Sequence, residues 1–310
     1  MVLKQAMEIF DLLDSSYANG EQVKEYLEKK GAKDIYVCTR EENGSSTDFI
    51  RIMIPGSNGK SVGGMAPTLG IVGRLGGLGA RPEQIGFVSD GDGALTALTC
   101  ASKILDMNQN GDAIPGDVYI CTHICPHAPT MPHVPVPFMG SPVDMAVMNE
   151  MEVCPEMDAV LSIDTTRGNR IINHNGFALS PTVKEGYILR VSEDLLDIME
   201  HTSGDLPYTF PITMQDITPY GNGIYHVNSI LQPSTATDAP VVGVAITATA
   251  VVPGCTTGST CFAAVDGAAR FSIEVAKRFS SNKCSFYDEK EYASLKEKYG
   301  PMTILQTAGR

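Results

Sequence analysis

Short, continuous apolar runs alternate with amphipathic stretches through most of this 310-residue chain. A strand that is buried on both faces of a sheet is apolar throughout, whereas the helices that cover it carry one apolar side. Four runs are typical of buried strands, at residues 85–90, 117–123, 158–166 and 241–252. The alternation predicts an α/β fold, a three-layer sandwich with a mixed, mainly parallel central sheet.

The remaining segments fit the same architecture. Further strands are expected at residues 34–39, 48–54, 169–175, 186–192 and 223–231, and helices at 93–107, 141–151, 193–201 and 261–279. Two short amphipathic helices form an N-terminal helical appendage at residues 1–32, and one of them presents Leu3, Met7, Phe10 and Leu13 on one face. Because no linker or repeat divides the chain, we expect a single domain over residues 1–310.

Glycine-rich stretches occupy residues 56–64 and 70–82. The first contains Gly-Lys-Ser, but only two residues separate Gly56 from Gly59, which is too few for a phosphate-binding loop. The second lacks the strand–turn–helix context of a dinucleotide fingerprint. We therefore expect a flap, or a close approach of the backbone to a ligand, and no particular nucleotide.

The net charge of the chain limits the kinds of partner that it can bind. The chain has 23 Lys and Arg against 36 Asp and Glu, a net charge of −13, which argues against nucleic acid and anionic membranes as partners. The partner that we expect is a small-molecule substrate. The most apolar run, residues 239–253, is shorter than the roughly 20 residues of a membrane span. The eight cysteines form no C-x-x-C pair and the start resembles no export signal, so we expect a cytoplasmic protein with reduced thiols.

Polar side chains end three of the predicted strands. Asp90, His123 and Asp164 would meet at one edge of the sheet if their strands are parallel neighbours. Carboxylate and imidazole groups suit zinc or a related divalent ion, so we expect these three as metal ligands. Asp92 would act as a base or hold a ligand in place, and Arg167 would bind a substrate carboxylate. The alternative is that the aspartates cap helices or turns and that His123 bonds a loop.

The proline-rich loop after the second of these strands is the densest cluster of potential ligands. Over residues 122–133 the end of the strand and this loop hold His123, Cys125, His127 and His133, which together could bind a soft or borderline metal. His127 is also a candidate substrate-binding residue. The alternative is a rigid loop at the surface or at a subunit contact.

The same loop, taken over residues 125–142, carries exposed-type apolar side chains without helical or strand periodicity: Met131, Val134, Val136, Phe138 and Met139. Apolar side chains on a surface loop usually need a cover, from the same subunit or from another. We therefore expect a homo-oligomer.

The segment at residues 89–105, SDGDGALTALTCASKIL, resembles the metal-bridging segment of the zinc-dependent exopeptidases, the aminoacylase/carboxypeptidase and tetrahedral-aminopeptidase families. There a strand delivers an aspartate, followed by a glycine-containing turn and an apolar helix. The later segments 116–123, 154–166 and 241–279 are similar in order to the elements that follow in those families. The resemblance implies their fold and a metal-dependent hydrolase of small amide or peptide-like substrates, with a divalent metal, zinc above all. Because ligands of that pattern are missing from this chain, we expect one ion per chain or fewer.

The sequence also departs from that pattern. Thr122 and His123 stand where those families have paired glutamates, and neither the early His-x-Asp motif nor the late histidine ligand is present. A threonine hydroxyl does not titrate near neutral pH, so Thr122 cannot replace a general base. A reduced or degenerate metal site is expected, and the alternative is a non-catalytic binding or assembly protein on a hydrolase fold. The whole sequence is also similar to a family of uncharacterised prokaryotic proteins of about this length.

A second chemistry centres on Cys255, in a turn between a predicted strand and a predicted helix. A thiol at a helix N-terminus has its thiolate stabilised by the helix dipole and by free N–H groups. The surrounding Gly-Cys-Thr resembles a segment of the cofactor-independent aspartate/glutamate racemases, which implies a cysteine-based racemase or isomerase with Cys255 as its nucleophile. The alternative is that this turn simply caps the helix.

Overall fold

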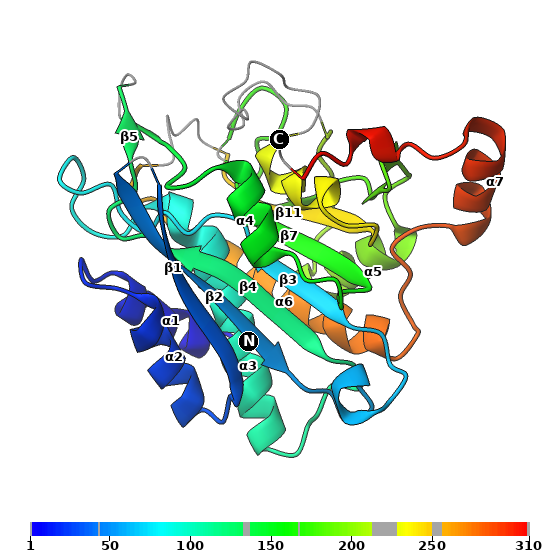
Figure 1. Ribbon diagram of the computed structural model, residues 1–310, viewed down its shortest axis with the longest axis horizontal. Coiled ribbons are helices and arrows are strands. Elements are labelled where there is room, and N and C mark those ends of the chain that lie inside the picture. The colour runs from blue at the N-terminus through cyan, green and yellow to red at the C-terminus, as the bar shows by residue number, and fades with distance from the viewer. Residues whose placement is uncertain are drawn as a thin grey trace.

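Figure 1 shows the computed structural model of the protein, which describes residues 2–42, 44–132, 137–166, 168–212, 228–249 and 256–308. Its strands are β1 (Asp34–Glu42), β2 (Ser45–Ile54), β3 (Leu69–Gly73), β4 (Val118–Ile124), β5 (Thr130–Met131), β6 (Phe138–Met139), β7 (Ala159–Thr165), β8 (Gly176–Leu179), β9 (Val183–Lys184), β10 (Tyr187–Ile188) and β11 (Val241–Thr247). Its α-helices are α1 (Leu3–Leu13), α2 (Gly20–Lys29), α3 (Asp92–Gln109), α4 (Met145–Glu152), α5 (Glu193–Ser203), α6 (Phe262–Ser280) and α7 (Glu289–Tyr299).

Within this described part, nine strands form one mixed sheet in the order β1-β2-β4-β3-β7-β11-β9-β10, with β8 also paired to β11. The four central strands β4, β3, β7 and β11 run parallel to one another. The outer strands β1 and β2 are antiparallel, as are β8 and β9 against β11. The expectation of an α/β fold with a mixed, mostly parallel central sheet is confirmed.

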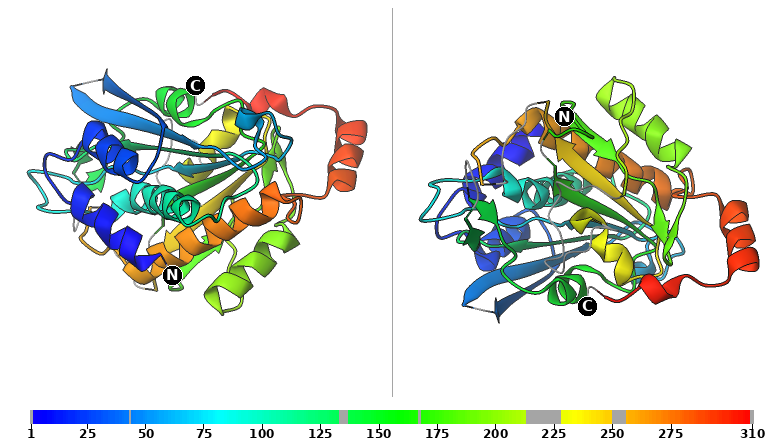
Figure 2. Two further views of the ribbon diagram at one scale, coloured as in Figure 1. Left: turned by 90° about the horizontal axis from the view of Figure 1, so that it is seen from below. Right: turned by 90° about the horizontal axis from the view of Figure 1, so that it is seen from above.

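Helices cover both faces of the sheet, as the two views in Figure 2 show. Helices α1, α2, α3, α5 and α6 pack on one face, while α4 and the 3-10 helix η3 (Ser229–Thr235) pack on the other. Side chains alternate between these faces along each strand. On β7, Leu161 and Ile163 join the core under the larger helical layer, whereas Val160 joins the core on the α4 face. Asp164 follows the parity of Val160 and therefore lies on the α4 face.

The two N-terminal helices form as expected, but the buried face of α1 differs from the predicted one. Ile9 and Leu13 are fully buried, whereas Met7 is 54% exposed. The reason is tertiary packing, because α1 lies against α3 and α6 and presents the stripe that fits them. After α2, Gly31 has a φ of +93°, the left-handed conformation that glycine commonly adopts just beyond a helix end.

The predicted strand at residues 85–90 is wrong. These residues form a loop that ends in the 3-10 helix η2 (Ser89–Gly91). The strand at the centre of the sheet is instead β3, which lies in the glycine-rich stretch and was not predicted as a strand. Its glycines permit close packing, because a Cβ at Gly73 would lie 2.6 Å from the carbonyl oxygen of Gly93 at the start of α3. The close approach of a helix to the strand explains why a sheet-centre strand is rich in glycine.

Several other boundaries also differ. Residues 169–175 are not a strand, since the side chain of Asn169 accepts the backbone N–H groups of Ile171 and Ile172 and makes a turn. The predicted strand at 223–231 lies partly outside the described residues, and its last residues belong to η3. Strand β11 ends at Thr247. Helix α4 begins after an Asp144 N-cap rather than near Ser141, and α7 was not expected.

No helix in the described part of the chain is long and apolar enough to cross a membrane.

The close packing of α3 on the sheet gives a testable prediction. An alanine Cβ at Gly93 would lie 2.9 Å from the Ile163 carbonyl oxygen and 3.0 Å from the Leu75 amide nitrogen. We expect Gly93→Ala to lower the free energy of unfolding by about 1–3 kcal/mol through overpacking. The control is Gly267→Ala in α6, where the nearest atom is a Phe177 ring carbon at an ordinary 3.4 Å. There alanine should raise the stability by up to about 1 kcal/mol, through helix propensity. Urea unfolding that gave both variants the same sign would contradict this packing.

Candidate functional site

The carboxyl ends of β3 and β4 open into a small cavity of about 50 Å³ on the α4 face of the sheet. Its walls come from segments that are far apart in sequence: Arg74, Leu75, Gly77, Asp90, His123, Met139, Gly140, Ser141, Pro142, Met145, Met148 and Ser229. This space is large enough to admit water and small polar groups. Ligand sites of open α/β sheets usually lie at this end of the strands.

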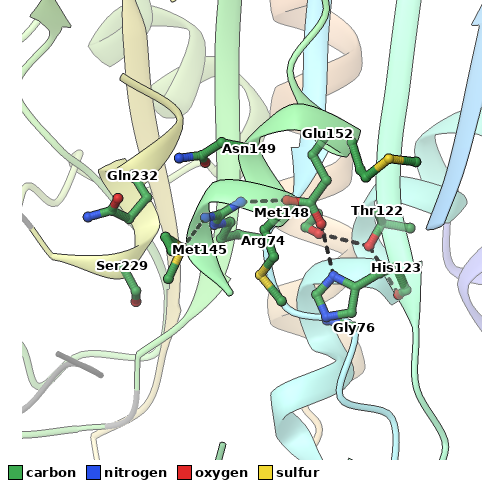
Figure 3. A network of polar contacts seen from close by, with 12 residues as sticks. Arg74, Gly76, Thr122, His123, Met145, Met148, Asn149, Glu152, Ser229 and Gln232 are labelled. Carbon is green, nitrogen blue, oxygen red and sulfur yellow. Dashed lines mark hydrogen bonds and ion pairs between the residues drawn. The ribbon is translucent and has the colours of Figure 1, made fainter. Parts of the chain in front are cut away.

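A buried carboxylate joins two of the strands beside this cavity (Figure 3). The Arg74 Nη1 group donates to Glu152 Oε2 at 2.6 Å, and His123 Nδ1 lies 2.8 Å from Glu152 Oε1. The side chains of Arg74, Glu152 and His123 are 1%, 0% and 2% exposed. The last residue of α4 is thereby tied to the ends of both β3 and β4. Three buried polar side chains satisfy one another, as such groups must.

Backbone contacts fix the ring of His123. Its Nε2 accepts the backbone N–H of Gly76 at 3.2 Å. Because a backbone N–H can only donate, Nε2 carries no proton, and Nδ1 donates its proton to Glu152. The turn after β3 is held tightly as well, since a Cβ at Gly76 would lie 1.8 Å from the His123 carbonyl oxygen. Only glycine fits at that position.

Asp164, the sixth residue of β7, lies beside this network and is 3% exposed. It accepts a hydrogen bond from the Ser229 hydroxyl at 3.3 Å, and Ser229 lines the cavity. Burial raises the pKa of Asp164 to about 7, although the Thr165 backbone N–H, the Arg74 guanidinium and Ser229 each lower it. A carboxyl group that titrates near neutral pH can both give and take a proton.

The three predicted metal ligands come close to the same place but in different roles. Asp90 and His123 both line the cavity, although Asp90 arrives from η2 rather than from a strand. Asp164 reaches the cavity through Ser229. The described residues contain no group of three or more His, Cys, Asp or Glu that could hold a metal ion.

The donor set itself does not fit zinc. Zinc binds an imidazole through a ring nitrogen that is free of a proton, and in His123 that nitrogen accepts the Gly76 N–H. The cation beside the carboxylates is the guanidinium of Arg74, which is fully ionised in proteins and repels a divalent ion. We therefore derive no chemistry through a metal at this site.

The other predicted site residues lie elsewhere. Asp92 is fully buried at the start of α3, where a carboxylate is favourable to the helix dipole, and it does not line the cavity. A ring nitrogen of His127 bonds the Ser16 carbonyl oxygen at 2.9 Å, and the Cys125 thiol donates to the Ser46 carbonyl oxygen. These two side chains therefore serve separate loop contacts. Arg167, His133 and Cys255 lie outside the described residues.

The loop expected to need a cover is partly buried within its own subunit. Cys125, Ala128 and Met139 pack with Ala80 and Val88 in a small cluster, whereas Met131 is 53% exposed. Val134, Val136 and the side chain of Phe138 lie outside the described part of the structure. The homo-oligomer stays a prediction.

Three residues of the site were not predicted from the sequence: Arg74, Glu152 and Ser229. Arg74 directly follows an apolar run, Leu69 to Gly73, and a charge at the end of a short buried run was the signal available. Glu152 ends a helix in which Asn149 is also buried. Two buried polar residues three positions apart lie on the same face of a helix and indicate that this face contacts other polar groups. The sequence alone does not show that they are buried.

A family model described as "Protein of unknown function (DUF1177)" matches residues 38–309. The chain belongs to this family. The match begins in β1 and includes the rest of the sheet and the whole cavity. No curated protein matches the chain. The function of this DUF1177 protein has therefore to be argued from the site itself.

A wider depression of about 1070 Å³ lies near the opposite end of the sheet, by the amino ends of β7 and β11. Asp158, Lys184 and Phe279 are among its lining residues. It is open and contains none of the candidate residues above. Size alone does not mark the functional site here, and the smaller cavity with the buried charges is the better candidate.

The raised pKa of Asp164 predicts a pH-dependent stability. The pKa rises from an ordinary 3.8 to about 7, so between these pH values the folded protein holds a proton that the unfolded chain has lost. Stability therefore falls as the pH rises through this window. Asp164→Asn removes the ionisable group, so wild type and variant should be equally stable below pH 4. At pH 8 the variant should be more stable, by on the order of 3–4 kcal/mol.

Urea unfolding at both pH values measures this difference. The control is Asp205→Asn on an exposed turn, which should change the stability little at either pH. A stabilisation by Asp164→Asn that is the same at pH 4 and pH 8 would contradict the assignment.

Proposed function

We propose that the protein is a hydrolase of small amide or peptide-like substrates and that the cavity at the carboxyl ends of β3 and β4 is its active site. The observation that carries the proposal is the meeting of a buried guanidinium and two buried carboxylates there: Arg74 and Asp90 line the cavity, and Asp164 joins it through Ser229. Buried charges are expensive to maintain, and their concentration in one cavity favours a chemical role over a structural one.

The proposed reaction uses the side chains in separate roles. Asp164, ionised above a pH of about 7, accepts a proton from water through the Ser229 hydroxyl. The oxygen of that water bonds to the carbonyl carbon of the substrate. The carbon–nitrogen bond then breaks, and the proton held by Asp164 passes to the leaving nitrogen. Arg74 supplies positive charge next to the carbonyl oxygen, where negative charge develops.

The resemblance to the zinc-dependent exopeptidases supports the same class of reaction. Asp90 precedes an apolar helix, and Asp164 lies near the carboxyl end of a parallel strand, as the resemblance implies. The exopeptidase-like fold is part of this proposal, and zinc is not. The cysteine-based alternative depends on Cys255, which lies outside the described residues, so no contact speaks for it.

Activity assays test the proposal. The untagged protein is assayed on N-acetyl amino acids, dipeptides and simple amides, with a chelator present. For a substrate that is turned over, kcat/KM should rise with pH to a plateau above about 7, as Asp164 ionises. Asp164→Asn should lower kcat by about 100-fold or more, the usual contribution of a general base.

The matched control is Asp158→Asn, which changes the carboxylate just before β7 that pairs with Lys60 at the surface. It should leave kcat unchanged. Hydrolysis that persists in Asp164→Asn would overturn the role of this residue. Substrate binding without any turnover across the panel would favour the non-catalytic binding protein instead.

A further inference from the structure

The guanidinium of Arg74 lines the cavity at which the sequence predicts a metal ion. Glu152 links it to His123, and its charge acts on Asp164. Asp90 lines the same cavity. The site therefore contains a fixed positive charge supplied by the chain itself.

One of the two terminal nitrogens of this guanidinium has only a weak hydrogen-bond acceptor. Among the described residues, its Nη1 donates to a carboxylate oxygen of Glu152, whereas its Nη2 points at the thioether sulfur of Met145. A thioether is a weak acceptor, and an ionised group that is 1% exposed normally has strong ones. Both Arg74 and Met145 line the cavity, so an oxygen atom placed there would be a better partner than the sulfur.

We propose that Arg74 replaces the divalent ion of this site and that its Nη2 binds the oxygen of a substrate carbonyl or carboxylate group, displacing the sulfur of Met145. Methionine is unbranched and flexible, so its side chain can move aside for a ligand. The identification of this oxygen with the reacting group of a substrate rests on the proposed hydrolase function, whereas the binding of the oxygen by Arg74 does not.

The size of the cavity limits what can be bound. The cavity is small, about 50 Å³, so a single carboxylate or carbonyl group is the part of a ligand that would reach Arg74. The planar fork of arginine matches a carboxylate better than a point charge does. The probe ligand is therefore acetate, the smallest stable carboxylate with a carbon substituent.

The test measures acetate and zinc binding separately from catalysis. Untagged, chelator-treated protein is titrated with sodium acetate at constant ionic strength and followed by NMR, and zinc binding is measured by calorimetry and metal analysis. The informative variant is Arg74→Met combined with Glu152→Gln, which removes both partners of the buried ion pair together. Arg74→Lys is the second variant, because it keeps the cation and removes the fork. The matched control is Arg51→Met, since Arg51 donates to the Met151 carbonyl oxygen and does not line the cavity.

We expect wild type and Arg51→Met to bind acetate alike. The double variant should bind it at least about tenfold more weakly, and Arg74→Lys by less than about tenfold. The wild type should contain less than one zinc ion per ten chains. Acetate affinity that is equal in wild type and in both Arg74 variants would overturn the proposal, as would one tightly bound zinc per chain that is lost in Asp164→Asn. If acetate binds through Arg74 but no amide is hydrolysed, the hydrolase function fails and the anion site stands.

Discussion

A single buried carboxylate, Glu152, ties the end of α4 to two strands of the sheet, through Arg74 on one oxygen and His123 on the other. None of these side chains reaches bulk water. Removing one partner from a buried pair leaves an uncompensated charge and typically lowers stability by about 3–5 kcal/mol. The position of α4, and with it one wall of the cavity, therefore depends on this carboxylate.

The network can exist only because the backbone approaches closely behind it. β3 lies between β4 and β7, and its Gly73 lets α3 pack directly on its end. The turn that follows places Arg74 toward α4 and brings the Gly76 N–H to the His123 ring. Burial raises the pKa of the neighbouring Asp164 to about 7, although the Arg74 guanidinium lowers it. Packing thus sets the protonation chemistry of the site.

The sequence carries enough information for the sheet but only part of the site. Two apolar runs that end in a polar residue correctly predicted β4 with His123 and β7 with Asp164. Parallel strands bring the side chains at their carboxyl ends to the same edge of the sheet, so these two residues were expected near one another. Asp90 was placed near the site through a strand that does not exist, and η2 brings it there instead. β3 was not predicted as a strand, because two of its five residues are glycine, a composition typical of loops.

Arg74 and Glu152 could not be predicted for a different reason. A charged residue in a glycine-rich stretch, or at the end of a helix, usually lies at the protein surface. Only tertiary packing buries both, and only their mutual contact makes that burial stable. The expectation of a metal came from ligand-type residues at the ends of predicted strands, and the pattern gave no sign that Arg74 lines the same cavity.

A double-mutant cycle on Arg74 and Glu152 tests the central claim most directly. Urea unfolding is measured for wild type, Arg74→Met, Glu152→Gln and the double variant at pH 7. The account predicts that each single change is strongly destabilising and that the double change costs less than their sum, with a coupling energy of about 2 kcal/mol or more. Effects that add to within about 0.5 kcal/mol would show that the two groups do not form a buried pair, and would contradict the account.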